Sequence, residues 1–475
     1  MHSARTNLTS SRPPSDPVRA RDLVTARVAA RAKRFPHFDL SPLDTNTLDR
    51  RDAALAHAID QAVARRWLTL VTVLQSQLSR PWDHLQPQVQ AALLTGAAQL
   101  LLLDRLPDHA VIHEAVQWTK TNVAAKASGL VNAVLRRVAN LRDRIVDDQG
   151  ETRFLIPRPP EDLPLHDGRA WRLKEPIFAD DPLCRLGQQT SHPPELLARW
   201  VQRFGQERTG QLAAHSLIHP PILVAGLPDE AEKSARVDTT ARDASSPPQC
   251  ESHEEQGFAV FDGDRTALEE LLRNFSNARV QDPSSARAVR STAHLAPNLI
   301  IEVCAGRGTK TRQLAELHPQ ACIVATDIKP PKLAALQEVF KSHTQVRVVE
   351  HGQLIEFAGH AELVVVDVPC SNTAVLARRV EAKYRFSRRS LAQLVKLQRQ
   401  IIADSIRLLT GTGQLLYSTC SLEPQENEQQ VEWIARWHQL RVRGQEQRLP
   451  RSLPGDPPSW YADGSYFALL GNSAW

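Results

Sequence analysis

Hydrophobic and polar residues follow two different patterns along this chain, and the first of them is helical. Up to about residue 145, apolar positions recur three and four residues apart, as in Leu93, Leu94, Ala97 and Leu101, which is the spacing of amphipathic helices. A further apolar stripe of this kind consists of Leu130, Val131, Val134, Leu135 and Val138. No β-rich run interrupts residues 20–145, so the pattern predicts an all-helical domain there.

The second pattern covers residues 298–418, where short apolar runs alternate with helical segments. The expected strands are Leu299–Val303, Cys322–Thr326, Val346–Val349, Leu363–Val366 and Gln414–Tyr417. The expected helices cover residues 310–318, 330–341 and 390–410. Alternating strands and helices predict an α/β fold, with a parallel sheet covered by helices on both faces. We assign residues 281–475 to this domain.

The rest of the chain lies outside these two regions. Residues 1–19 are rich in serine and proline and are expected to be disordered. Prolines are frequent in residues 146–189, which predicts a linker. The pattern of residues 190–280 predicts a small α+β domain with a polar insertion near 229–257. We assign no chemistry to this insertion. The expected helices and strands of the domain are Pro194–Phe204, Leu268–Phe275, Pro221–Val224 and Phe258–Phe261.

Composition excludes several classes of protein. With 475 residues, 42% of them hydrophobic and 23% charged, the chain is long enough for about three domains and is not disordered overall. No apolar run reaches the roughly 18 residues of a membrane helix, and the N-terminal sequence lacks a secretory signal. The 6 cysteines are scattered and form no CxxC pair, so we expect a reducing, cytoplasmic location and no metal site.

The charge is unevenly distributed. The chain has a net charge of +5, but residues 1–150 alone carry 20 Lys and Arg against 14 Asp and Glu. A basic region suits a polyanionic partner, because Lys and Arg make most contacts to phosphates. Simple solubility is the other explanation, and charge alone favours nucleic acid only slightly.

The residues that follow the expected strands carry the candidate chemistry, because ligands of such sheets bind beyond the carboxyl ends of the strands. After the first strand comes a turn with two glycines and free N–H groups, formed by Cys304, Ala305, Gly306, Arg307, Gly308, Thr309 and Lys310. After the second strand, Asp327 could accept the two hydroxyls of a ribose, or it could cap the following helix. The pair predicts a nucleoside-containing cofactor without separating a nicotinamide from S-adenosylmethionine.

Two cysteines follow the last two expected strands, Cys370 beside Asp367 and Cys420 after Tyr417–Thr419. One such cysteine is more often an inert core residue, but two at matching strand ends favour a thiolate active site. Methylation at carbon 5 of a pyrimidine needs this set. A thiolate adds to carbon 6, a protonated or proton-sharing Asp367 stabilises ring nitrogen 3, and a second thiol assists release.

A basic segment with aromatic residues lies between the two cysteines. Its basic residues are Arg378, Arg379, Lys383, Arg385, Arg388 and Arg389, interleaved with Tyr384 and Phe386. Such a segment suits phosphate contacts and base stacking, although a charged run is more often a solvated helix face. Its position between the cysteines favours RNA binding.

These motifs resemble a known family. Residues 366–371 and 417–428, which contain Asp367-Val368-Pro369-Cys370-Ser371 and Ser418-Thr419-Cys420-Ser421, are similar to the paired signatures of the Nol1/Nop2/Sun family of S-adenosylmethionine-dependent RNA cytosine-5 methyltransferases. Residues 281–285 and 463–467 resemble the segment before that fold and its closing strand. Residues 105–111 and 129–137 resemble a NusB-like helical domain, a pairing that marks the bacterial B-type enzymes for 16S rRNA.

The resemblance implies a role for each matching residue. Cys420 would be the nucleophile, Cys370 would help resolve the adduct, and Asp367 would contact the cytosine and lie near the cofactor. Residues 304–310 would hold the methionine end of S-adenosylmethionine, and Asp327 its ribose. It also implies a fold: an all-α NusB-like RNA-binding domain, the small α+β domain, and a Rossmann-like class I methyltransferase domain.

The chain departs from the family pattern at three places. The loop that usually reads C-A-A-P-G-G-K has Gly306, Arg307 and Thr309 in place of Ala, Pro and the second Gly. The acid expected near the adenine is missing from His351-Gly352-Gln353. The usual S-G-T-G after the first cysteine reads Ser371-Asn372-Thr373-Ala374.

The leading hypothesis is therefore a monomeric, cytosine-5 methyltransferase of small-subunit rRNA that uses S-adenosylmethionine and neither metal nor membrane. A tRNA cytosine is an alternative substrate. The alternative from another class is a non-catalytic RNA-binding ribosome assembly factor, which would not need the two thiols. A small-molecule methyltransferase would not need the basic segment.

Overall fold

The computed structural model describes residues 19–38, 41–103, 106–147, 156–228 and 249–472. The chain divides into two compact units. The first reaches Asp143 and includes Leu173–Ile177, and the second comprises Arg144–Arg172 and the chain from Phe178 onward. The predicted disordered segment 1–19 lies outside the described residues, apart from Arg19.

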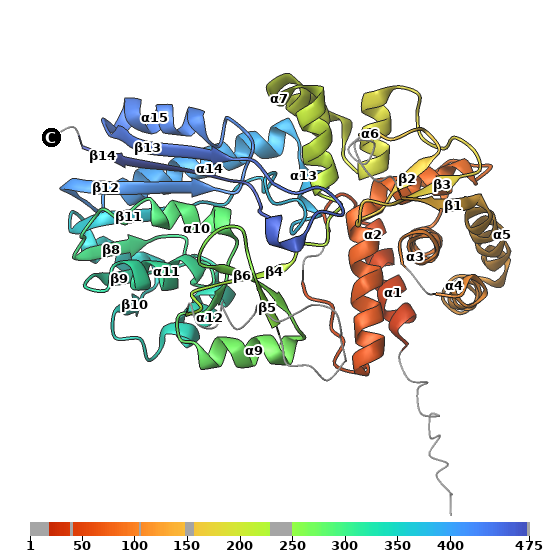
Figure 1. Ribbon diagram of the computed structural model, residues 1–475, viewed down its shortest axis with the longest axis horizontal. Coiled ribbons are helices and arrows are strands. Elements are labelled where there is room, and N and C mark those ends of the chain that lie inside the picture. Colours follow the sequence, from red (N-terminus) through yellow and green to blue (C-terminus); the bar gives the residue numbers. More distant parts are fainter. Residues whose placement is uncertain (1–18, 39–40, 104–105, 148–155, 229–248, 473–475) are drawn as a thin grey trace, which may run out of the picture. The chain divides into compact units, whose positions relative to one another are not determined.

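The first unit is helical, as predicted (Figure 1). Its helices are α1 (Ala20–Ala32), α2 (Arg50–Ser76), α3 (Pro87–Leu102), α4 (Asp108–Asn122) and α5 (Ala125–Leu141), with a 3-10 turn η1 (Trp82–His84). α3 is apolar on nearly all sides and packs against the other four helices. A Cβ at Gly96 would lie 2.6 Å from a methyl carbon of Leu135, so the missing side chain allows α5 to approach α3 closely. The short strand β1 (Arg142–Val146) follows α5.

Within the described residues, the second unit contains a seven-stranded sheet in the order β10-β9-β8-β11-β12-β14-β13. Its strands are β8 (Leu299–Glu302), β9 (Cys322–Ala325), β10 (Val346–Val348), β11 (Ala361–Asp367), β12 (Leu409–Thr419), β13 (Arg441–Arg448) and β14 (Ser465–Gly471). The first five strands of that order are parallel, and β14 pairs antiparallel with both β12 and β13. The five strands predicted from the apolar runs are confirmed.

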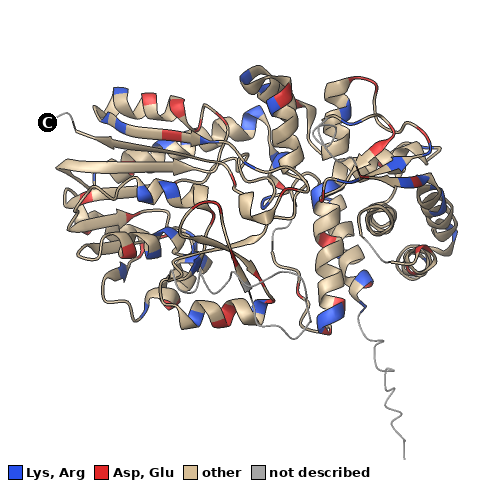
Figure 2. Cartoon of the chain, viewed as in Figure 1, with Lys and Arg blue, Asp and Glu red and all other residues tan. Residues whose placement is uncertain are grey.

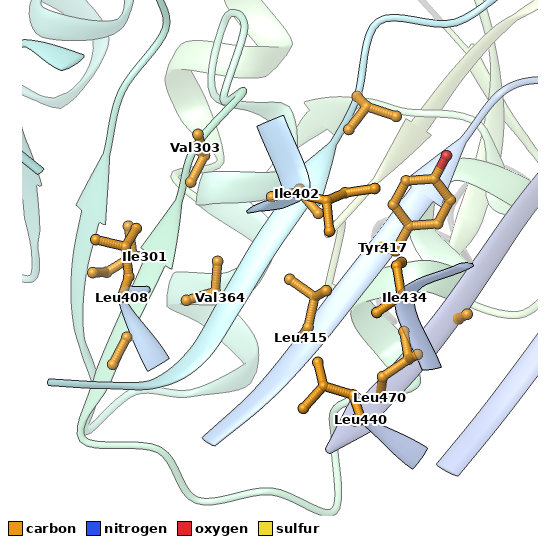
Figure 3. Packing of buried hydrophobic residues seen from close by; sticks show 14 of the residues in the cluster. Ile301, Val303, Val364, Ile402, Leu408, Leu415, Tyr417, Ile434, Leu440 and Leu470 are labelled. Atoms are coloured by element: carbon orange, nitrogen blue, oxygen red, sulfur yellow. The ribbon is translucent and has the colours of Figure 1, made fainter. Parts of the chain in front are cut away.

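Helices cover both faces of this sheet (Figure 1). One face packs against α14 (Arg388–Ile406) and α15 (Glu428–His438), and the other against α10 (Pro283–Arg290), α11 (Thr309–Leu317) and α12 (Pro330–Phe340). Neighbouring strand residues alternate between the faces: Ile301 and Val364 lie in the first core, and Ile300 and Val365 in the second. Figure 3 shows Ile301, Val364 and Leu415 in one layer with Ile402 and Ile434. Burial on both faces explains the continuous apolar runs of the sequence.

A four-stranded sheet in the order β5-β6-β4-β7 lies in the same unit. Its strands are β4 (Ile222–Ala225), β5 (Gln249–Ser252), β6 (Phe258–Asp262) and β7 (Arg279–Val280). The helices α6 (Pro182–Thr190) and α7 (Pro194–His215) precede it in the chain, and α9 (Arg265–Asn274) lies between β6 and β7. α7 extends beyond the predicted Phe204, with a break at Gly205, where φ is 78°.

Two predictions about irregular segments are wrong in part. The expected linker 146–189 contains β2 (Asp162–Pro164), β3 (Ala170–Leu173) and most of α6, because the antiparallel β2–β3 pair and the buried Leu163 and Leu173 stabilise it despite its prolines. The expected polar insertion ends in strand β5, whose Cys250 packs into an apolar core. Residues 229–248 lie outside the described residues.

Candidate active site

The predicted site residues gather at the carboxyl ends of the parallel strands. β8 leads into residues 303–308, β9 into Asp327, β11 ends at Asp367, and β12 ends just before Cys420. Asp367 is opposite Ser418 in the register of β11 and β12. Because the carboxyl ends of parallel strands meet at one edge, these side chains share one site.

The two predicted thiols touch each other. Cys370 Sγ lies 3.1 Å from Cys420 Sγ, and the backbone N–H of Cys420 donates to Cys370 Sγ at 3.4 Å. Both cysteines are free. Two reduced thiols in contact, on neighbouring loops, can act on the same atom or exchange a proton.

The two thiols differ in their surroundings. Cys370 is buried, whereas Cys420 is partly exposed. The hydrogen bond with Cys420, together with burial, holds the pKa of Cys370 well above its usual range. Cys370 therefore stays protonated near neutral pH, and Cys420 is the more accessible of the two thiols.

Asn372 contacts the partly exposed thiol, a contact that sequence analysis did not predict. Cys420 Sγ donates to Asn372 Oδ1 at 3.1 Å, and Asn372 Nδ2 donates to the carbonyl of Cys370 at 2.9 Å. Asn372 has a φ of 60°, a left-handed conformation that asparagine adopts more readily than most residues. The family's usual glycine at this position was the only indication in the sequence that the backbone turns here.

Asp367 forms an ion pair at the centre of the site. Lys310 Nζ lies 2.7 Å from Asp367 Oδ2 and 3.2 Å from Ser285 Oγ, and Ser418 Oγ donates to Asp367 Oδ1 at 2.7 Å. Burial lowers the pKa of Lys310, but the charge and hydrogen bond of Asp367, together with Glu302 and Cys420, outweigh burial and the pKa is raised. Lys310 belongs to the predicted cofactor loop, but its ammonium group contacts Asp367, the carboxylate predicted to act on the cytosine.

The glycine turn after β8 has the backbone that its sequence requires. Gly306 and Gly308 have φ values of 64° and 85°, which favour glycine. Asp327 is buried, and it accepts hydrogen bonds from the N–H groups of Gly306 at 3.1 Å and Lys329 at 2.9 Å. Asp327 thus ties the glycine turn to the start of α12.

The residues around this turn suit S-adenosylmethionine. A Cβ at Gly306 would meet nothing within 4 Å, so open space adjoins the turn. Asp327 offers a carboxylate for ribose hydroxyls, and Ile328 next to it is 73% exposed and offers an apolar surface for an adenine ring. The first turn of α11 provides N–H groups for the carboxylate of the methionine end.

A third cysteine at the strand ends is a poor nucleophile. Burial raises the pKa of Cys304 to about 12, and the carboxylates of Asp367, Asp327 and Glu302 act in the same direction. Its thiol therefore stays protonated, which agrees with a role in the cofactor loop.

The structure changes the prediction for the basic segment. Lys383 is fully buried and its ammonium group donates to the carbonyl of Thr190 at 3.1 Å, so the prediction that it contacts RNA is wrong. Arg378 pairs with Asp463 at 2.6 Å and lies over the ring of Tyr461, so its guanidinium already has an acidic partner although its side chain is 30% exposed. Both arise from tertiary packing that a charge pattern does not reveal.

Three other arginines of that segment remain on the surface. Arg379, Arg388 and Arg389 are exposed, and the Arg388 side chain is 83% exposed beside Glu195. Arg385 is half-buried and pairs with Glu381 at 3.4 Å. The predicted RNA contacts thus reduce to Arg379, Arg388 and Arg389 and, in part, Arg378 and Arg385, which already have acidic partners.

Two absences hold for the part of the chain that the structure describes. It contains no cluster of three or more His, Cys, Asp or Glu that could hold a metal ion. None of its helices is both long and apolar enough to cross a membrane.

Family models match two parts of the chain. Residues 293–449 match the family described as 16S rRNA methyltransferase RsmB/F, and residues 22–140 match the NusB family. The first match contains the glycine turn and both thiols, and the second spans α1 to α5.

Similar proteins match nearly the whole chain. Ribosomal RNA small subunit methyltransferase B of Vibrio cholerae serotype O1 is 26% identical over 463 residues, which cover 94% of this chain and 98% of that protein. The protein of the same name from Xanthomonas campestris pv. campestris is 28% identical and covers 81% of this chain and 79% of its own length. The crystal structure of PH0851 has a TM-score of 0.66 at 16% identity and covers 96% of this chain and 99% of that chain, which shows a shared fold.

Proposed function

The chain belongs to the 16S rRNA methyltransferase RsmB/F family, with a NusB-family domain before its methyltransferase domain, and from that premise we propose that it methylates carbon 5 of a cytosine in small-subunit rRNA. The methyl donor in this proposal is S-adenosylmethionine. One observation carries the proposal: two free thiols in contact, at the strand ends beside an Asp–Lys pair. Transfer of a methyl group to a nitrogen or oxygen atom would need neither thiol.

Cys420 acts as the nucleophile in this proposal. Its thiol loses a proton to solvent and the sulfur adds to carbon 6 of the cytosine. The electron pair of the 5,6 double bond shifts into the ring, and the resulting enamine has a nucleophilic carbon 5. S-adenosylmethionine supplies an electrophilic methyl group when it is bound. Once carbon 5 is methylated, it loses its proton to solvent, the double bond forms again, and the Cys420 sulfur leaves.

Asp367 and Lys310 stabilise the adduct. Addition at carbon 6 raises the electron density at ring nitrogen 3 and the neighbouring oxygen, and a shared proton or an ammonium group offsets it. The 2.7 Å contact between Lys310 Nζ and Asp367 Oδ2 supplies both. Ser418 Oγ, at 2.7 Å from the other oxygen, fixes the orientation of the carboxylate.

Cys370 assists the release of the enzyme. Because Cys370 stays protonated and its sulfur is 3.1 Å from that of Cys420, it can donate a hydrogen bond to the Cys420 sulfur as the carbon–sulfur bond breaks. In this proposal the more accessible thiol, Cys420, is the nucleophile, and the buried thiol, Cys370, assists its release.

RNA contacts in this proposal come from the exposed arginines of the segment between the cysteines and from the helical domain. Arg379, Arg388 and Arg389 lie on the surface of the unit that contains the thiols. The names of the similar proteins favour small-subunit rRNA over tRNA. A non-catalytic assembly factor would not need the thiols in contact.

The proposal is tested by methyl transfer from labelled S-adenosylmethionine to unmodified small-subunit rRNA, with bulk tRNA in parallel. Hydrolysis of the RNA should yield labelled 5-methylcytidine from rRNA only, and the Cys420→Ala variant should give no label. Label in tRNA only would show that the substrate is a tRNA instead of the rRNA. Label in a nucleoside other than 5-methylcytidine would contradict the proposed methylation at carbon 5 of cytosine. No label in either RNA would favour the assembly factor.

A further inference from the structure

We infer that Glu426 is a positioning residue that holds Cys370 and Cys420 in contact; the inference rests on the roles proposed above for the two thiols. Glu426 lies in the turn between Cys420 and α15, six residues after the nucleophile. It is fully buried at 0% exposure. Nothing in the mechanism described so far uses this carboxylate.

The contacts of Glu426 come from the residue that follows each cysteine. Glu426 Oε2 accepts hydrogen bonds from Ser371 Oγ at 2.5 Å and from Ser421 Oγ at 2.5 Å. Glu426 Oε1 accepts from the backbone N–H of Ser371 at 3.0 Å. One carboxylate therefore binds the loop of Cys370 and the loop of Cys420 at the same time.

The carboxylate is itself anchored to the core. Gln398 Nε2, on α14, donates to Glu426 Oε1 at 2.9 Å and to the carbonyl of Pro369 at 2.9 Å. Tyr417 OH, on β12, donates to the carbonyl of Glu426 at 2.6 Å. Glu426 therefore links both cysteine loops to a helix that packs on the sheet and to a strand of the sheet itself.

The chemistry of the site requires an acceptor with no hydrogen to donate. Two hydroxyls, one backbone N–H and one amide N–H converge on Glu426, and all of these donors are neutral. Burial raises the pKa of Glu426, and the hydrogen bonds from Ser371, Ser421 and Gln398 oppose this. A buried carboxylate is costly unless several donors satisfy it, and here each contact also fixes a loop that carries a thiol.

Loss of this carboxylate should loosen the loops without unfolding them. Ser371 Oγ also lies 3.0 Å from Ser421 Oγ, and the backbone N–H of Leu422 donates to Thr373 Oγ1 at 2.8 Å. These contacts join the two loops directly and remain in a Glu426 variant. The expected defect is therefore in the distance between the thiols rather than in the fold.

The test compares Glu426→Ala, Glu426→Gln and the control Glu432→Gln in the full-length protein. Glu432 is an exposed acid of α15, so its variant removes the same charge away from the site. The first readout is equilibrium binding of phenylarsine oxide. Its arsenic forms bonds to two thiol sulfurs, and its oxygen leaves as water with the two thiol protons. Cys420→Ala provides the background from single thiols.

Two thiols held in contact bind arsenic tightly because the second bond forms within the molecule. We expect Glu426→Ala to bind phenylarsine oxide at least about 10-fold more weakly than the wild type. Glu426→Gln should have an intermediate affinity, because glutamine keeps the shape and one acceptor. Glu432→Gln should match the wild type. The second readout is methyl transfer. A misplaced thiol should lower kcat of Glu426→Ala about 100-fold, while KM for RNA and for S-adenosylmethionine stays within about twofold.

Wild-type arsenic affinity in Glu426→Ala would overturn the inference, and so would an unchanged kcat. A KM increase with an unchanged kcat would also overturn it. If Glu426→Ala does not fold, Glu426→Gln takes its place in both measurements. This variant is expected to fold, with a melting temperature that matches that of the control. Binding of phenylarsine oxide needs no RNA, so it tests the role of Glu426 independently of methyl transfer. If the wild type transfers no methyl group, the proposed function is contradicted, but the binding measurement still tests the inference about Glu426.

Discussion

A buried acid at the end of β8 shows how single residues set the electrostatics of the site. Glu302 is 1% exposed, and its Oε2 accepts a hydrogen bond from Thr311 Oγ1 at 2.6 Å. The pKa of Glu302 is raised to about 7: burial is the main cause, Asp367 and Asp327 also raise it, and Thr311 and Lys310 lower it. In the folded protein, Glu302 therefore carries a proton about half of the time near neutral pH.

This shift predicts a pH-dependent effect of Glu302→Gln on stability. A raised pKa in the fold means that Glu302 stabilises the protein below the pKa of the unfolded chain and that this contribution is lost as pH rises towards 7. Glutamine keeps the acceptor for Thr311 and does not ionise. Relative to the wild type, Glu302→Gln should gain on the order of 3 kcal/mol of unfolding free energy between pH 4 and pH 8.

Urea unfolding of both proteins at the two pH values, without cofactor, measures this difference of differences. An equal offset at pH 4 and pH 8 would show that the pKa of Glu302 is not raised. Glu362→Gln serves as the control, because the pKa of this acid is lowered, not raised, by hydrogen bonds from Asn298.

The sequence predicted which residues gather in the candidate active site, but it did not predict all of their side-chain contacts. Cys370, Cys420 and Asp367 could be placed because strand ends share an edge whatever their side chains do. The Lys310–Asp367 pair and the Asn372–Cys420 contact depend on rotamers and on a left-handed backbone. The burial of Lys383 depends on α6 packing over it. A one-dimensional charge pattern contains none of these.

Among the helices and strands of the site, the turn from β8 into α11 has little room for substitution, because α12 packs directly against it. A Cβ at Gly308 would lie 2.4 Å from a ring carbon of Phe340 and 2.8 Å from a methyl carbon of Leu336. Phe340 and Leu336 belong to α12 and are buried in the core. The absence of a side chain at Gly308 therefore lets α12 close against the turn.

We predict that Gly308→Ala is more damaging than Gly306→Ala. Both positions have a positive φ, which costs an alanine about 1 kcal/mol, but only Gly308 also forces a clash in the core, which adds about 1–3 kcal/mol. Thermal unfolding should show a clearly lower melting temperature for Gly308→Ala. Equal losses in the two variants would show that α12 does not pack against the turn as described.

The regular elements were predictable because their patterns are strong. The doubly buried strands of the sheet and the helices between them follow from their apolar runs. The sequence did not predict that α6 and α7 pack on the cysteine loops, where Leu197 and Trp200 share a core with Leu376 and Leu422. That contact joins residues nearly 200 positions apart, so no local pattern records it.

At the scale of the whole molecule, the helical unit offers a basic surface. α5 carries Lys and Arg and no acidic residue (Figure 2), and its Lys126 and Arg136 are exposed. The sequence predicted the order of the domains and the excess of basic residues before residue 150. It could not predict which of these residues are exposed, because some, such as Arg31 beside Asp60, are buried in ion pairs.

We predict that replacing Lys126 and Arg136 by alanine weakens binding to small-subunit rRNA and reduces its salt dependence. Removal of one basic side chain that binds a phosphate should lower the slope of log affinity against log salt by about 1. The control replaces the exposed Arg265 and Lys341 of the other unit by alanine, which changes the net charge equally. A filter-binding series from low to high salt checks this, and equal slopes for both pairs would exclude α5 as an RNA-binding element.

In the proposed mechanism, Cys420 forms a covalent bond to the target cytosine and Cys370 helps to break it. The most direct test of this mechanism is to incubate Cys370→Ala with small-subunit rRNA and S-adenosylmethionine, and then to identify the peptide linked to RNA by mass spectrometry. We expect a stable adduct through Cys420 that is absent from the double variant without both thiols. An adduct that accumulates in Cys420→Ala and not in Cys370→Ala would reverse the roles, and methylated rRNA with no adduct in any variant would contradict the mechanism.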